Sequence, residues 1–134
     1  MYTTSVPIRV RYSETDRMGY VYYGNYAAYF EVSRVEALRS LGITYKSMED
    51  KGVMLPVLEF SIKYFKPAFY DDLLTINVLI PSLPAARIFF EYETLNESGV
   101  LLNKASTTLV FINKTTNRPC AAPESLLERM RKYF

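Results

Sequence analysis

The chain has 134 residues, 49 % hydrophobic and 22 % charged, a composition typical of one globular domain, which we expect to span residues 1–134. Sixteen basic and fourteen acidic residues leave a net charge of +2, too balanced for a nucleic-acid binder that relies on bulk charge. With no histidine and one cysteine, Cys120, the chain cannot form a Ser-His-Asp or Cys-His nucleophile pair or a histidine-containing or thiolate zinc site. An enzyme with this composition is expected to use a carboxylate as its base, without a metal or other cofactor.

No apolar stretch approaches the ~20 residues that a membrane helix needs, and the N-terminus lacks the charged and apolar regions of a signal peptide. A single cysteine gives no intrachain disulfide, which suits a reducing compartment. We therefore expect a cytoplasmic protein without integral membrane association.

The chain begins with a predicted strand and continues into a predicted helix. PIRVRY, residues 7–12, alternates apolar and basic residues, as a strand with one buried face does. Residues 23–41 then follow a helical period, and Gly42 stands where a C-terminal glycine cap is expected. Arg34 falls within the apolar arc of this helix, and we expect it to form an ion pair with Glu31 one turn earlier.

A short helical turn, four strands and a final helix follow the long helix. The turn is expected at residues 44–52, the strands at 58–65, 73–80, 87–95 and 100–112, and the last helix at 123–134. Short turns join the four strands, so they can pair as neighbours, and the long helix is the only long crossover. This order favours an α+β fold, in which a curved five-stranded antiparallel sheet wraps around the long central helix.

One loop stands out by its composition. YSETDRMGYVYYGNYAAYFE, residues 12–31, carries the carboxylate of Asp16, then Gly19 and several tyrosines before it runs into the long helix. Together with VSRVEAL, which follows it, this stretch resembles the signature of the hotdog-fold thioesterases of the 4-hydroxybenzoyl-CoA type. Within that family it is similar to the acyl-CoA thioesterase branch associated with bacterial envelope maintenance. The likeness continues through FSIKYFKPAFYDDLL, residues 60–74, and the strand order extends it over nearly the whole chain.

The resemblance implies a hotdog fold, a homodimer as the smallest active unit, often a homotetramer, and hydrolysis of an acyl-CoA to a free acid and coenzyme A. Carried over by position, Asp16 is the catalytic carboxylate, and the backbone N–H of Tyr23 polarises the thioester carbonyl. The envelope-associated branch often has a histidine where this chain has Tyr23. Because the donor is a main-chain group, the expected role survives this difference.

The residue chemistry is compatible with these roles. Asp16 can act as a general base on water or as a nucleophile that forms an anhydride, and the sequence leaves both routes open. The residues just before Tyr23 have no capping side chain, so the first amides of the helix would stay free for a carbonyl oxygen. Alternatively, Asn25 caps a helix that begins at Tyr26.

Further substrate contacts are expected from the same loop and from two strands. The candidates are Gly19, Tyr22, Asn25, Phe60 and Arg87. The resemblance implies that the acyl pocket lies between subunits, so that the segment around Phe60 in a partner completes it. Several cations are candidates for the phosphates of coenzyme A, and Arg87, beside a proline-bounded turn, is favoured over Lys63, Lys66, Lys104 and Arg118.

Two other functions stay open at this point. The substrate could be an acyl group carried by an acyl carrier protein instead of coenzyme A, or the chain could be a non-catalytic hotdog module that binds acyl chains. The presence of Asp16 beside Gly19 argues against the module. A hotdog dehydratase is disfavoured because such enzymes use a histidine, which this chain lacks.

Overall fold

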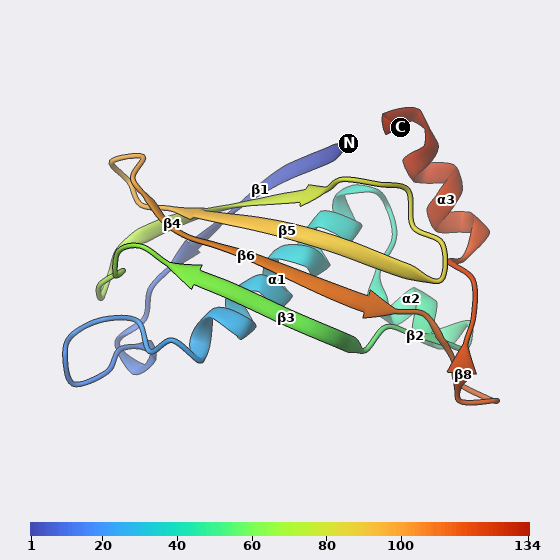
Figure 1. Ribbon diagram of the computed structural model, residues 1–134, viewed down its shortest axis with the longest axis horizontal. Coiled ribbons are helices and arrows are strands. Elements are labelled where there is room, and N and C mark those ends of the chain that lie inside the picture. Colours follow the sequence, from blue (N-terminus) through green and yellow to red (C-terminus); the bar gives the residue numbers. More distant parts are fainter.

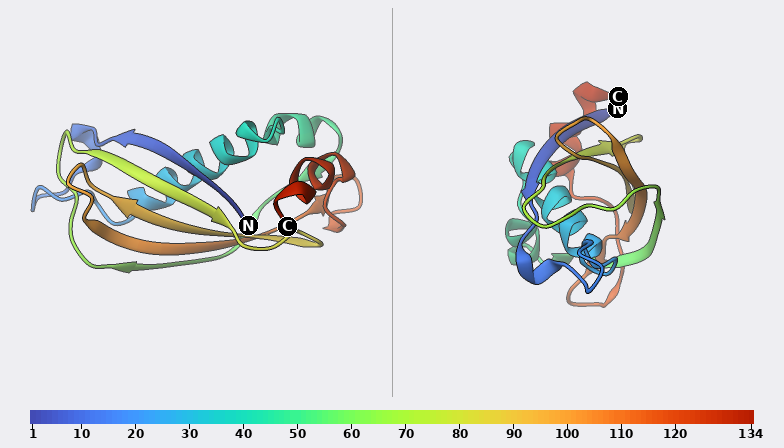
Figure 2. Two further views of the ribbon diagram at one scale, coloured as in Figure 1. Left: turned by 90° about the horizontal axis from the view of Figure 1, so that it is seen from above. Right: turned by 90° about the vertical axis from the view of Figure 1, so that its left-hand side faces the viewer.

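The computed structural model describes residues 1–134, and its main layer is an antiparallel sheet that curves around one long helix (Figures 1 and 2). The helix, α1, comprises Asn25–Ser40. The five strands lie in the order β1 (Tyr2–Arg9), β4 (Leu73–Ile80), β5 (Arg87–Leu95), β6 (Leu101–Val110) and β3 (Val57–Tyr64). Every pairing is antiparallel. This is the hotdog arrangement that the resemblance implied.

Smaller elements close the two ends of this layer. They are η1 (Tyr12–Glu14), α2 (Tyr45–Asp50), the three short strands β2 (Val53–Met54), β7 (Ile112–Asn113) and β8 (Arg118–Pro119), and the C-terminal α3 (Glu124–Met130) and η2 (Arg131–Tyr133). The first and last residues lie close together, since the Met1 amino group donates to the Tyr133 carbonyl (2.6 Å; Figure 1). None of the helices combines the length and the apolar character needed to cross a lipid bilayer.

The core forms where the inner face of the sheet meets α1. Alternate residues of β4 point inward and are fully buried, as the strand pattern predicts. On α1, the predicted apolar arc is also buried, and the Phe30 ring stacks on the Tyr92 ring of β5 with centroids 4.5 Å apart. The long helix is thus fixed along the sheet by aromatic packing, which sets the position of its N-terminus.

Both predicted boundaries of the first strand were wrong. β1 begins at Tyr2 instead of residue 7 and ends at Arg9, because the chain then turns away. Val10 is still anchored there: its N–H donates to the Asp72 carbonyl (2.9 Å), while Tyr12 is exposed in η1. The predicted C-terminal cap of α1 is confirmed, since Gly42 has a φ of +83° that favours glycine.

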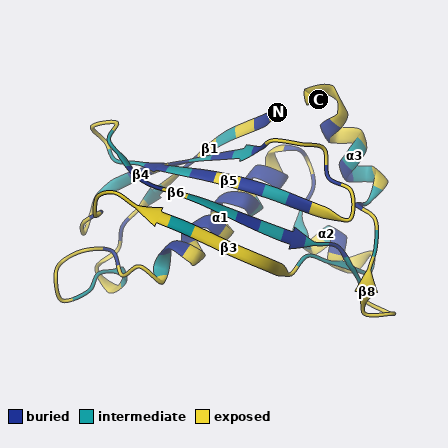
Figure 3. Cartoon of the chain, in the orientation of Figure 1, coloured by how far each residue is buried: buried dark blue, intermediate teal, exposed yellow.

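β3 is a sheet edge whose side chains are mostly exposed (Figure 3). Leu58 is 54 % exposed and Phe60 is 41 % exposed, although both stand at alternating apolar positions of the strand predicted at residues 58–65. The backbone groups on the outer side of β3 also lack a neighbouring strand. An exposed apolar edge of this kind is a ready site for pairing with another strand.

Candidate active site

The loop between β1 and α1 is held to the rest of the chain by backbone hydrogen bonds. The Val21 N–H donates to the Ala68 carbonyl (2.9 Å), and the Tyr22 N–H donates to the Glu14 carbonyl (2.8 Å). The chain reverses at Gly19, whose φ of +81° is accessible to glycine without strain. The segment that carries the predicted site is therefore fixed relative to the sheet.

Asp16 uses its two carboxylate oxygens differently. Oδ1 accepts hydrogen bonds from the backbone N–H groups of Met18 (2.9 Å) and Tyr20 (3.2 Å). Oδ2 accepts no hydrogen bond from the chain. A turn-forming role, common for aspartate in such loops, thus accounts for one oxygen only. The other oxygen is available to a water molecule or to a substrate carbonyl carbon.

Asp16 lines a cavity of about 300 Å³ at the start of α1. The walls come from the loop, from α1 and its approach, and from the end of β3 and the segment after it: Met18, Tyr20, Val21, Tyr23, Tyr26, Tyr64, Phe65, Lys66 and Pro67. Most of these side chains are hydrophobic. Among the predicted phosphate-binding cations, only Lys66 shares this cavity with Asp16.

The two backbone amides that precede α1 are unpaired. The helix begins at Asn25, and its cap residue is Gly24, which has no side chain to accept a hydrogen bond. The N–H groups of Asn25 and Tyr26 donate to the carbonyls of Tyr22 (2.9 Å) and Tyr23 (3.3 Å). The expected alternative, in which Asn25 caps a helix that begins at Tyr26, is therefore wrong. The N–H groups of Tyr23 and Gly24 donate to no acceptor in the chain. Such amides carry the partial positive charge of a helix N-terminus, which attracts an oxygen that gains negative charge.

The neighbouring carbonyl groups fix how these amides point. The Tyr22 carbonyl accepts from the Asn25 N–H (2.9 Å), and the Tyr23 carbonyl accepts from the Tyr64 hydroxyl (3.2 Å). In a trans peptide the C=O and the following N–H point in opposite directions. The N–H groups of Tyr23 and Gly24 therefore point away from the helix, into the space in front of its N-terminus.

A second carboxylate, Glu14, supports this loop and was missed by the sequence reasoning. It accepts hydrogen bonds from the Arg11 backbone N–H (2.8 Å) and the Tyr29 hydroxyl (2.9 Å). Although partial burial opposes its charge, these hydrogen bonds lower the pKa of Glu14 below its ordinary value. The Asn25 side-chain amide donates to the Glu14 carbonyl (2.8 Å), so one predicted substrate contact already joins the loop to the helix.

The structure brings some of the other predicted contacts to the site and leaves others away from it. Gly19 and Tyr22 belong to the same loop but do not line the cavity that contains Asp16. Phe60 lines a second cavity, of about 420 Å³, that also contacts Gly24 at the start of α1. Arg87 begins β5 and pairs with Val110, at the opposite end of the sheet from Asp16 within one chain.

The expected ion pair between Glu31 and Arg34 does not form. Arg34 is only 6 % exposed, and its Nε donates to the Tyr45 hydroxyl (3.2 Å). No carboxylate lies within 4.0 Å of its guanidinium, and Glu31 is exposed. The aliphatic part of Arg34 is buried between the helix and the sheet, and a phenol is its partner. This arrangement prevails over the Glu31–Arg34 ion pair that the spacing along the helix suggests.

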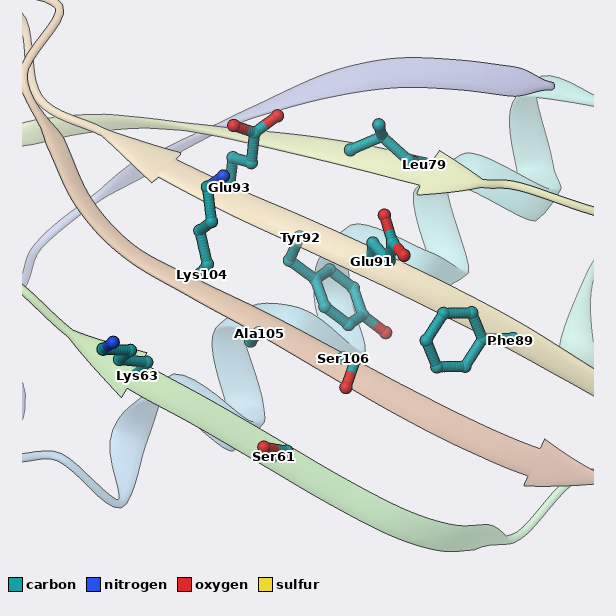
Figure 4. A pocket seen from close by; sticks show the side chains of 10 residues that line it. All are labelled: Ser61, Lys63, Leu79, Phe89, Glu91, Tyr92, Glu93, Lys104, Ala105 and Ser106. Carbon is teal, nitrogen blue, oxygen red and sulfur yellow. The ribbon is translucent and has the colours of Figure 1, made fainter.

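A further hollow, of about 440 Å³, lies on the side of the sheet that faces away from α1 (Figure 4). Its rim carries Lys63 of β3 and the neighbouring Glu93 and Lys104, which are cross-strand partners. Neither Asp16 nor the helix amides contribute to it. This polar surface has carboxylates of its own but lacks the unpaired amides that would stabilise an oxyanion.

Known proteins resemble the chain over most of its length. The family model described as the thioesterase-like superfamily matches residues 10–130. The acyl-CoA thioester hydrolase YbgC of Escherichia coli is 30 % identical over 126 residues, 94 % of this chain and 94 % of that protein. The acyl-CoA thioesterase YbgC of Haemophilus influenzae is 32 % identical over 91 % of this chain and 90 % of its own. A solved structure of a DHNA-CoA thioesterase from Staphylococcus aureus superposes with a TM-score of 0.94 at 33 % identity, covering 99 % of this chain and 91 % of that one.

Proposed function

The chain belongs to the thioesterase-like superfamily, and on that basis we propose that it hydrolyses acyl-CoA thioesters to a free acid and coenzyme A. The observation that carries the proposal is the combination at the start of α1: an unoccupied carboxylate oxygen on Asp16 and unpaired amides at Tyr23 and Gly24. Thioester hydrolysis needs a group that activates the attack and donors for the oxygen that becomes negative. We propose that residues 1–134 form one thioesterase unit.

In the proposed reaction, the thioester oxygen lies at the Tyr23 N–H. Oδ2 of Asp16 removes a proton from a water molecule as the water oxygen attacks the carbonyl carbon. The resulting oxyanion is stabilised by the helix amides, for which one donor is typically worth ~3–4 kcal/mol of the barrier. The C–S bond then breaks, and the coenzyme A thiolate leaves without needing a strong general acid. Direct attack by Asp16 to give an anhydride is the alternative first step.

The test is thiol release from a panel of short, long and aromatic acyl-CoAs by the wild type and Asp16→Asn. Asparagine keeps an Oδ1 that can accept from the Met18 and Tyr20 amides, so the turn is preserved while the base is lost. We expect a loss of at least ~10²-fold. A no-substrate control removes the signal of Cys120. Equal rates for both proteins would show that Asp16 only shapes the turn, and turnover of acyl carrier protein thioesters alone would identify the other carrier.

A single turnover in ¹⁸O-labelled water detects the anhydride route in which water attacks the aspartyl carbon. If Asp16 acts as a general base, the label appears only in the released acid. If Asp16 forms an anhydride and water attacks the aspartyl carbon, the label appears in the Asp16 carboxylate of the recovered protein. Mass spectrometry of the peptide that contains Asp16 reports the difference.

We also propose that the active unit is a homodimer joined through the exposed edge of β3. An antiparallel pairing about a two-fold axis at Ser61 would place Glu59 opposite Lys63 of the second copy, so that each copy supplies one charge of two ion pairs. The same pairing puts the Val57 end of one strand beside the Tyr64 end of the other. The second copy's segment around Phe60 would then adjoin the cavity that contains Asp16, and sedimentation as a stable monomer would contradict the shared site.

We further propose a cytoplasmic location, supported by the single cysteine, which suits a reducing compartment. Fractionation of cells that express the chain with a C-terminal epitope would test it. Recovery with a cytosolic marker enzyme is the expected result, and recovery with membranes or in the medium is the contrary one.

A further inference from the structure

The cavity that Phe60 shares with the start of α1 is long enough to hold an acyl group. It follows the helix from Gly24 to Arg34, ten residues that rise about 15 Å. Helical side chains lean toward the N-terminus, which shortens the distance from the Gly24 amide to the Arg34 guanidinium to roughly 10 Å. Phe30 and Phe60 wall the middle of the cavity, with ring centroids 6.0 Å apart. An acyl group bound by its carbonyl at the helix amides would extend along this wall.

The far end of this cavity holds a buried charge without a counter-charge. The one side-chain partner of Arg34 in the chain is the Tyr45 hydroxyl, the nearby Tyr92 hydroxyl pairs with Thr107, and no carboxylate lies within 4.0 Å of the guanidinium. Burial raises the pKa of Tyr45 to about 12 and also raises that of Tyr92, so both phenols are neutral near pH 7. A guanidinium has five N–H donors, and only that of Nε has a partner in the chain, so the Nη groups of Arg34 are open to a ligand in the cavity.

The single carboxylate in this cavity does not relieve the imbalance. Glu31 lines the cavity one turn nearer the helix start, but it is exposed and not bonded to Arg34. The remaining lining is apolar or neutral: Gly24, Ala27, Ala28, Val57 and Thr107. The geometry therefore presents a path that begins at oxyanion-binding amides, passes two phenyl rings and ends at donors that lack an acceptor.

We propose that Arg34 is a specificity residue that binds an oxygen at the far end of the acyl group, so that the preferred substrates end in a carboxylate or a hydroxyl instead of a methyl group. This inference rests on the proposed thioesterase function and names the acyl class for its site. Arg34 contacts the acyl tail and takes no part in the chemical step. Glu31, at the side of the path, can accept from a terminal hydroxyl but repels a terminal carboxylate, so the two oxygen-bearing ends are distinguishable.

The test compares three acyl-CoAs of one length: octanoyl-CoA, 8-hydroxyoctanoyl-CoA and suberyl-CoA, whose eight-carbon chain ends in a carboxylate. For the wild type we expect kcat/KM for at least one oxygen-terminated substrate to exceed that for octanoyl-CoA by about tenfold or more, the effect of one hydrogen bond to a charged group. In Arg34→Met this ratio should fall by about tenfold while octanoyl-CoA is still hydrolysed. Arg39→Met, which removes an exposed arginine of the same helix, is the matched control and should keep the ratio.

The outcomes separate this inference from the proposed function. If the wild type hydrolyses octanoyl-CoA at least as well as both oxygen-terminated substrates, the proposed role of Arg34 is wrong, while the proposed thioesterase function stands. This comparison needs only the wild type, so it holds even if Arg34→Met fails to fold. If no thiol is released from any substrate, the dissociation constants of the three acyl-CoAs for Asp16→Asn, measured by calorimetry, decide the question. Tighter binding of an oxygen-terminated chain supports the inference, and equal binding of all three contradicts it.

Discussion

β1 meets solvent with threonine, serine, proline and arginine side chains, whereas β3, the opposite edge of the same sheet, exposes valine, leucine, phenylalanine and tyrosine. Pro7 lacks an N–H and is tolerated in an edge strand, where it reduces the capacity of β1 to pair further. β3 has no such protection. The side chains thus make one edge of the sheet discourage association and the other invite it, and the inviting edge also borders both cavities at the start of α1.

The largest expected effect comes from placing a charge on the apolar edge. Leu58→Asp should leave the isolated chain folded, because Leu58 is 54 % exposed, but would bury a carboxylate in the proposed dimer. We expect the dimer dissociation constant to rise by at least ~10²-fold, since an unpaired buried charge costs several kcal/mol. Sedimentation velocity measures the change. Thr3→Asp, at an exposed position of β1, is the control and should have no effect on mass.

The charges of β3 offer a test of register. Glu59→Lys should weaken the dimer by roughly tenfold, because like charges would stand directly opposite each other in both symmetric pairs. Adding Lys63→Glu to the same chain restores opposite charges and should restore the affinity. The effect should shrink at high salt. A double variant no better than the single one would rule out the register centred on Ser61.

The loop that follows β1 has a pH-dependent anchor in Glu14. Its pKa is lowered in the folded state, so the carboxylate stabilises the fold above its ordinary pKa of 4.5, and this contribution is lost as the pH falls through the lowered value. We expect Glu14→Gln to lose about 1 kcal/mol at pH 7, the scale of a net hydrogen bond. Urea unfolding at pH 7 and near pH 3 measures it. A difference that persists undiminished in acid would assign the effect to packing.

The smallest predicted effect concerns the hydroxyl of Tyr64, at the end of β3. It donates to the Tyr23 carbonyl and so helps to orient the Gly24 N–H. Tyr64→Phe should lower kcat about two- to fivefold with little change in KM, because a positioning group acts on the reacting geometry and not on ground-state binding. Tyr133→Phe, at the other end of the chain, is the control. A rise in KM with an unchanged kcat would instead make Tyr64 a substrate contact.

Local periodicity was sufficient to predict the main elements of the fold. The alternation of Leu74, Ile76 and Val78 predicted β4, and the apolar arc with Phe30 and Leu38 predicted the buried face of α1. These patterns succeed because each face is buried along its whole length. β1 was placed five residues late because its polar threonines and serine obscure an alternation that begins at Tyr2.

The candidate site depended on information that spacing does not contain. Asp16 and Tyr23 were named through the likeness to a family, and the structure places both at one cavity. Arg34 was paired with Glu31 because they are one turn apart, yet its hydrogen-bond partner comes from α2, an element that only tertiary folding brings near. Arg87 was favoured from its neighbouring prolines, but the strand carries it to the far end of the sheet.

The double hydrogen bond to Oδ1 of Asp16 has a consequence for the entropy of activation. A free aspartate samples several orientations of its carboxylate, and ordering it would be required in every catalytic cycle. Here two backbone amides hold the group, so its orientation is established once, during folding. The remaining oxygen then presents its lone pairs in a fixed direction to each arriving water or acyl group. The entropy cost of orienting the carboxylate is therefore met when the loop folds and is not repeated in each reaction.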